Sequence, residues 1–131
     1  MAPTISGGID HIHIYASDRE AAADWYADML GLTPDPDTAM WAVSPSGPLT
    51  VADVSGNIHL AIFRAKQPRP QSFAFGVSGE EYERWNSHLN HKGLQVIERN
   101  HTLSWSIYIT DPYENKLEFT TYDHAYIKDR R

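Results

Sequence analysis

The chain has 131 residues, which is enough for one ordinary domain with its own hydrophobic core. It contains no cysteine, which excludes disulfides, iron–sulfur clusters and thiolate chemistry, so any metal must be held by imidazole and carboxylate groups. A net charge of −6 argues against a nucleic-acid partner. The sequence shows neither a signal segment nor a membrane-length apolar stretch, so we expect a cytoplasmic protein with no membrane partner.

The first half of the chain predicts a strand, a helix and three further strands. Residues 9–15 alternate in polarity, which is typical of a half-buried strand. Ser17 to Glu20 fits a capping box at the start of a helix, and Gly31 stands where a helix commonly ends. Short strand signals follow at 40–44, 49–54 and 57–63.

The second half repeats this order. A strand at 73–77 precedes a second capping box, Ser78 to Glu81, and Gly93 ends the helix. Strand signals follow at 95–99, 105–110 and 116–122. We therefore predict an α+β fold in which two βαβββ modules form a curved mixed sheet, shaped as a cup with the helices outside. The single domain, 1–131, would comprise module one (8–64), a linker (65–71), module two (72–122) and a C-terminal tail (123–131).

Side-chain parity separates the strands into two faces, because alternate residues of a strand point to opposite sides. One face is apolar throughout and is expected to pack against the helices. The other carries small, aromatic, imidazole and carboxylate side chains, which is typical of a concave pocket rather than of a plain solvent face. Its candidate functional residues are His11, His13, Tyr15, His59, Phe63, Ser72, Tyr108, Glu118 and Tyr122.

The two halves place their candidate ligands at related positions. His11 and Ser72 stand on the first strand of each half, and His59 and Glu118 stand on the last. Two imidazoles and one carboxylate suit Fe(II), Mn(II), Ni(II) or Zn(II). We predict that His11, His59 and Glu118 hold one divalent metal ion.

Two parts of the chain resemble the vicinal oxygen chelate superfamily, which includes glyoxalase I, extradiol dioxygenases, fosfomycin-resistance enzymes and bleomycin-binding proteins. These parts are Ile9 to Leu32 and Ile109 to Glu118, and the resemblance extends over nearly the whole chain. It implies that His11 and Glu118 are metal ligands and that a further family ligand position falls on Ser72. His59 stands where similar glyoxalase I enzymes carry an acidic ligand. Glu114 replaces a glycine that the family pattern places after Pro112.

The resemblance implies a metal-dependent enzyme that acts on a small organic substrate chelated through adjacent oxygens. We favour dioxygenase-like chemistry on an aromatic substrate, with Tyr108 and His13 as catalytic candidates. The other candidates at the pocket are Tyr15, Phe63, Ser72 and Tyr122. A glyoxalase-like lyase or isomerase is one alternative, and a non-catalytic drug- or metabolite-binding protein of the bleomycin-resistance type is another. Relatives of this size also imply a homodimer.

Overall fold

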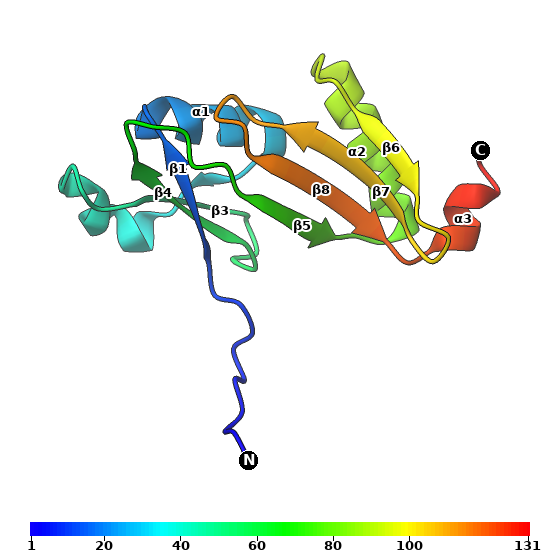
Figure 1. Ribbon diagram of the computed structural model, residues 1–131, viewed down its shortest axis with the longest axis horizontal. Coiled ribbons are helices and arrows are strands. Elements are labelled where there is room, and N and C mark those ends of the chain that lie inside the picture. Colours follow the sequence, from blue (N-terminus) through cyan, green and yellow to red (C-terminus); the bar gives the residue numbers. More distant parts are fainter. The chain divides into compact units, whose positions relative to one another are not determined.

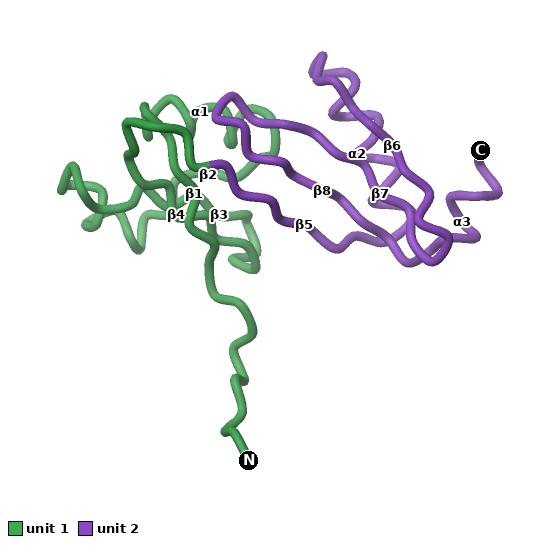
Figure 2. The backbone as a smooth tube through the Cα atoms, in the orientation of Figure 1, with its two compact units in different colours: residues 1–69 green, residues 70–131 purple.

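The computed structural model describes residues 1–131, which divide into two compact units, residues 1–69 and 70–131 (Figure 2). Each unit contains one four-stranded sheet with both parallel and antiparallel pairs, and a helix between its first two strands. The predicted α+β fold with two βαβββ modules is therefore confirmed.

The first unit is built from a mixed sheet with the strand order β1-β4-β3-β2 (Figure 1). β1 runs parallel to β4, whereas β3 pairs antiparallel with both β4 and β2. The elements in chain order are β1 (Ile12–Ala16), α1 (Arg19–Leu30), β2 (Thr33–Pro34), the 3₁₀ helix η1 (Pro36–Val43), β3 (Leu49–Ala52) and β4 (His59–Arg64).

The second unit has the same arrangement, with the strand order β5-β8-β7-β6 and a parallel pair between β5 and β8 (Figure 1). Its elements are β5 (Ser72–Gly76), α2 (Gly79–His91), β6 (Ile97–Asn100), β7 (Trp105–Thr110), β8 (Lys116–Thr121) and α3 (His124–Lys128). α3 lies in the segment that the sequence indicated only as a tail.

The parity of the strands is as predicted. On the helix-facing side Leu60 and Ile62 of β4 are fully buried, and so are Ile107 of β7 and Leu117 of β8. α1 packs against β3 and β4, and α2 packs against β8. Burying these aliphatic side chains stabilises each unit by about 1.5–3 kcal/mol per residue, so a one-residue change of register would be strongly unfavourable.

The strand predicted at 40–44 is wrong, because these residues belong to η1 and to the turn after it. Pro36 stands at the start of η1, and the Asp35 carboxylate accepts the backbone N–H of Asp37, which favours a helical turn. The buried guanidinium of Arg19 also donates to the carbonyls of Ala42, Ser44 and Gly47, at 2.6, 3.0 and 2.6 Å. The second strand of the module is instead the short β2, next to β3.

The start of α1 also differs from the prediction by one residue. Asp18, rather than Ser17, is the N-cap, and its carboxylate accepts the backbone N–H of Ala21. The predicted box at Ser78 and Glu81 is confirmed, with both reciprocal hydrogen bonds present. Gly31 has a φ of 70° after the last residue of α1, which is the left-handed conformation that glycine adopts most readily.

None of the helices is both long and apolar enough to cross a membrane.

Candidate functional site

Two histidines of the first unit lie side by side on the sheet face that points away from α1. His13 is the second residue of β1 and His11 immediately precedes the strand, so the two side chains point to the same side. Their Nε2 atoms are 3.0 Å apart and their rings are stacked. The Nδ1 atom of His11 is 2.8 Å from the carboxylate of Asp10. His11 remains 43% exposed, so a ligand can reach it.

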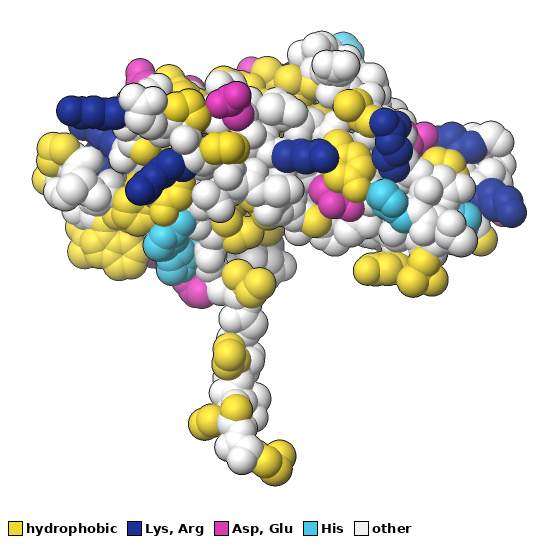
Figure 3. Space-filling model, in the orientation of Figure 1, with side chains coloured by type: hydrophobic (Ala, Val, Ile, Leu, Met, Phe, Trp, Pro, Cys, Tyr) yellow, Lys and Arg dark blue, Asp and Glu magenta, His cyan; other side chains and the backbone are white.

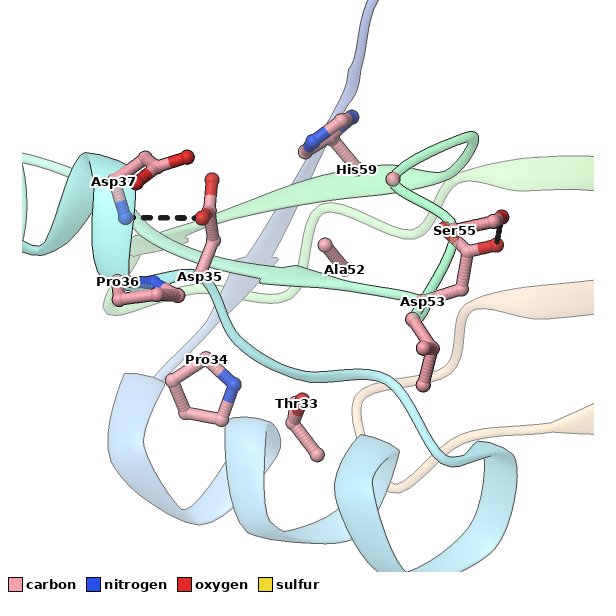
Figure 4. A pocket seen from close by; sticks show the side chains of 11 residues that line it. Thr33, Pro34, Asp35, Pro36, Asp37, Ala52, Asp53, Ser55 and His59 are labelled. Atoms are coloured by element: carbon pink, nitrogen blue, oxygen red, sulfur yellow. Dashed lines mark hydrogen bonds between the residues drawn. The ribbon is translucent and has the colours of Figure 1, made fainter.

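His59 is the first residue of β4, and its side chain lines a cavity of about 350 Å³. Figure 4 shows the labelled residues of this cavity, with Asp35 and Asp37 at the start of η1 and Asp53 after β3. The β1–β4 register pairs Ile12 with Leu60. His11 stands one residue before this pairing begins. His11 and His13 do not line the cavity.

Aromatic side chains continue this face along β1 and β4. Tyr15 pairs with Phe63, with ring centroids 6.1 Å apart, and the Phe63 ring is 4.8 Å from that of His13. The guanidinium of Arg69 lies 4.8 Å from the Tyr15 ring. Figure 3 shows histidine side chains beside hydrophobic ones on the first unit, close to the N-terminal segment. The face thus joins ligand-type nitrogens to an aromatic wall.

In the second unit, Glu118 is held by hydroxyl groups of its own sheet. It is the third residue of β8 and faces Ala74 on one side and Tyr108 on the other. The buried Ser106 hydroxyl donates a hydrogen bond of 2.6 Å to Oε2 of Glu118 and is 3.0 Å from the hydroxyl of Thr120. This contact orients a half-buried carboxylate, and the cross-strand neighbour of Glu118 on β5, Ala74, carries only a methyl group.

Tyr108 has a phenol that stays protonated at neutral pH. Burial, together with the negative charge of Glu118, raises the pKa of Tyr108 above its usual value. Its hydroxyl oxygen is 2.8 Å from Nε2 of His101, and the ammonium of Lys116 lies 4.9 Å from its ring. Tyr108 is therefore suited to donate a hydrogen bond, not to act as a base.

The other two candidates of the second unit are more exposed. Ser72 is the first residue of β5 and is exposed opposite Lys116. Tyr122 follows β8 and is 74% exposed.

The structure thus brings His11 and His13 together in one unit, and Glu118 and Tyr108 together in the other. It contains no group of three or more His, Asp or Glu side chains close enough together to hold a metal ion. The donor chemistry nevertheless fits a divalent transition metal, because imidazole nitrogens and an oriented carboxylate are the ligands such ions take in a cysteine-free chain.

Three residues that contact the candidate side chains were not predicted. Asp10 directly precedes His11 in the sequence, and this adjacency was the available signal for their contact. Ser106 is on the predicted face, two residues before Tyr108, but its bond to Glu118 depends on the β7–β8 register. His101 lies in the turn between β6 and β7, and this turn brings its Nε2 atom to 2.8 Å from the Tyr108 hydroxyl.

The chain is similar to several solved structures. It is 26% identical to oxidase ChaP-H1, with a TM-score of 0.65 over 86% of this chain and 94% of that one. It is 23% identical to a putative glyoxalase family protein from Bacillus anthracis, with a TM-score of 0.70 over 93% and 99% of the two chains. A third is a mutant of the fosfomycin resistance protein FosX from Listeria monocytogenes, complexed with Mn(II) and 1S,2S-dihydroxypropylphosphonic acid. It is 16% identical, with a TM-score of 0.70 over 94% of this chain and 98% of that one.

No curated protein matches this chain. The family model described as Glyoxalase/Bleomycin resistance protein/Dioxygenase superfamily matches residues 8–119, which is most of the sequence. The matched range runs from Gly8 to Phe119 of β8 and contains almost all of both modules. The chain therefore belongs to the glyoxalase, bleomycin resistance protein and dioxygenase superfamily.

Proposed function

We propose that the protein is a metal-dependent enzyme in which His11, His59 and Glu118 hold one divalent ion, Fe, Mn, Ni or Zn. Its substrate is a small organic molecule with two adjacent oxygens. A bound ion of this kind supplies Lewis-acid stabilisation of negative charge on the substrate oxygens. Three protein ligands leave positions free for a chelating substrate, which favours a catalytic over a closed structural site.

The observation that supports this proposal is that two of the three candidate ligands, His11 and Glu118, are already oriented by a neighbour. Asp10 contacts the Nδ1 atom of His11, which leaves Nε2 for a ligand, and Ser106 contacts one oxygen of Glu118. Metal-binding imidazoles and carboxylates are commonly held in this way by hydrogen-bonding partners.

Tyr108 and His13 are the residues proposed to act on the substrate. The protonated phenol of Tyr108 donates a hydrogen bond to a substrate oxygen that gains negative charge, and Glu118 lies opposite it on β8. His13 is adjacent to His11 and therefore lies within reach of whatever His11 binds. Tyr15 and Phe63 form an aromatic wall beside His13. Ser72 and Tyr122 of the second unit are also proposed to contact the substrate.

Among the reactions of the superfamily, we favour oxidation of an aromatic, catechol-like substrate by dioxygen. Two imidazoles and one carboxylate are the ligand set typical of non-haem Fe(II) oxygenases. The aromatic wall suits a planar apolar ring, and the similarity to oxidase ChaP-H1 supports the same class of chemistry.

Metal analysis of protein purified without chelator tests the proposal. We expect about one divalent ion per chain in the wild type and loss of that ion in His11→Ala and Glu118→Ala. His91→Ala, an exposed position at the end of α2, serves as the matched control. If the wild type carries no stoichiometric metal and is not stabilised by added Fe(II), Mn(II), Ni(II) or Zn(II), the proposal fails.

The reaction itself is tested by two assays of the metal-loaded protein. Catechols incubated with air are expected to yield ring-cleavage products, whereas methylglyoxal with a thiol is expected to remain unchanged. The opposite result would replace oxidation with a glyoxalase-like isomerisation. We also propose a homodimer, and light scattering that gives the mass of one chain at micromolar concentration would exclude it.

A further inference from the structure

The distance between the two neighbouring imidazoles of the first unit is the distance found between two ligands of one metal ion. The Nε2 atoms of His11 and His13 are 3.0 Å apart. Metal–nitrogen bonds of about 2.0–2.1 Å at angles between 90° and 109° place two ligating nitrogens about 2.9–3.4 Å apart. A metal ion can therefore replace the hydrogen bond between the two rings without a large movement of either histidine.

Both rings are held in the orientation that this requires. The contact between Asp10 and Nδ1 of His11 leaves the Nε2 atom of His11 as the one that faces His13. The ring of His13 packs against Phe63 at 4.8 Å and stacks on His11 at 4.9 Å, which restricts its rotation. His13 is the second residue of β1 and His11 immediately precedes the strand, and the contact between their Nε2 atoms shows that the two side chains lie on one side.

We infer that His13 is a metal ligand, together with His11, and that it supplies the nitrogen that Ser72 cannot provide. This inference rests on the proposed function and replaces the role of acid or base for His13. A serine hydroxyl is a neutral oxygen donor and a weaker ligand for Fe(II), Ni(II) or Zn(II) than an imidazole. His59 and Glu118 keep the ligand roles proposed above.

The alternative is that His13 only supports His11 by a hydrogen bond, as Asp10 does. The two cases differ in where the metal binds on the ring and in how much affinity is lost when the side chain is removed. Loss of an outer hydrogen-bonding partner typically lowers metal affinity about 10–100-fold. Loss of a direct ligand is expected to lower it by more than this range.

The decisive measurement is the imidazole ¹⁵N spectrum of the full chain during titration with Zn(II), which is diamagnetic. We expect the Nε2 resonances of both His11 and His13 to shift at one equivalent, while those of His91 remain in place. A shift of His11 alone overturns the inference and leaves the proposed function intact. If no histidine shifts, the proposed function fails as well.

Affinity measurements by calorimetry with Zn(II) and Mn(II) supply a second, independent readout. His13→Ala is expected to weaken binding more than about 100-fold, and Asp10→Asn about 10–100-fold. His13→Asp, which restores a ligand at the same position, is expected to recover part of the loss. A His13→Ala protein with a native circular dichroism spectrum and less than a tenfold change in affinity overturns the inference.

Discussion

The hydroxyl of Ser106 lies 2.6 Å from Oε2 of Glu118, across adjacent strands of the second sheet. Ser106 is fully buried, whereas Glu118 is only half-buried, so a buried hydroxyl holds one oxygen of a partly exposed carboxylate. The hydrogen bond therefore restricts the orientation of the Glu118 side chain.

Removing this hydroxyl is expected to weaken metal binding without removing a ligand. Ser106→Ala should lower the affinity for Mn(II) about 10–100-fold, because Glu118 loses the partner that orients it. Isothermal titration calorimetry of both proteins measures the change. Ser104→Ala, just before β7, is the matched control and should bind as the wild type does. Equal affinities for Ser106→Ala and wild type would show that the hydrogen bond does not prepare the carboxylate.

The pKa of Tyr108 is expected to respond to the charge opposite it. Burial and the Glu118 carboxylate both raise the pKa of this phenol, so Glu118→Gln should lower it towards its usual value while burial is unchanged. Alkaline titration of the phenolate absorbance measures the pKa, with the signal of Tyr108 obtained by subtracting that of the Tyr108→Phe form of each protein. A higher pKa in Glu118→Gln would contradict this account.

The turn between β7 and β8 holds a non-glycine residue in the left-handed region. Glu114 has a φ of 71°, at the position where the family pattern carries glycine. Glu114→Gly should therefore raise the free energy of unfolding by about 0.5–1 kcal/mol, since relief of the steric cost exceeds the added chain entropy. Urea denaturation provides the value. Glu114→Ala keeps the Cβ atom and should give no such gain; an equal gain would assign the effect to the lost charge.

The N-cap of α1 can be assigned by two neighbouring substitutions. Asp18→Ala removes the acceptor for the N–H of Ala21 and should lower the free energy of unfolding by about 1 kcal/mol. Ser17→Ala, at an exposed position outside the helix, should change it by less than about 0.5 kcal/mol. Thermal unfolding of the pair tests the assignment, and the reverse order of effects would restore Ser17 as the cap.

Glu98 is expected to contribute to stability in a way that is lost in acid. Its hydrogen bonds to Arg131 hold the pKa of this carboxyl below its usual value, and the buried Tyr82 hydroxyl donates to it at 2.8 Å. A lowered folded-state pKa stabilises the fold above the unfolded pKa of about 4.3, and this is lost as pH falls through the folded value.

The acid limb is the fall in the free energy of unfolding as the pH decreases from about 7 to about 3. Glu98→Gln should therefore make this limb flatter, as measured by urea denaturation. Glu80→Gln removes an exposed ion pair with Arg84 and should leave the limb nearly unchanged. An acid limb as steep in Glu98→Gln as in the wild type would exclude Glu98 as its source.

The parts of the fold that were predictable are those governed by local patterns. The strand 105–110 and the capping box at Ser78 were predicted with the correct residues, because alternation and capping depend on neighbours in sequence. The segment 40–44 reads as a strand from its apolar residues alone. In the folded chain, Arg19, more than twenty residues away, donates hydrogen bonds to the carbonyls of Ala42 and Ser44, and this contact is not visible in the local pattern.

The candidate site was likewise predictable only where it depends on local patterns. Its face was predictable from parity, and so was the placement of His13 beside His11, since the two residues are two positions apart at the start of β1. Contacts made across strands were not. His101 reaches Tyr108 across the β6–β7 hairpin, and Ser106 contacts Glu118 only because β7 and β8 pair in one particular register. These contacts depend on tertiary pairing that single-sequence patterns do not specify.

His59 and Glu118 stand at different positions along their strands, and this difference limits how the two modules can be recombined. His59 opens β4, while Glu118 is the third residue of β8, opposite Ala74. The two modules are therefore not interchangeable. A tandem chain made from two copies of module one would carry the proposed ligands His11 and His59 without Glu118, and one made from module two would carry Glu118 without those two histidines. Shuffling of modules between relatives should thus exchange them as complementary pairs, with each half kept in its own position.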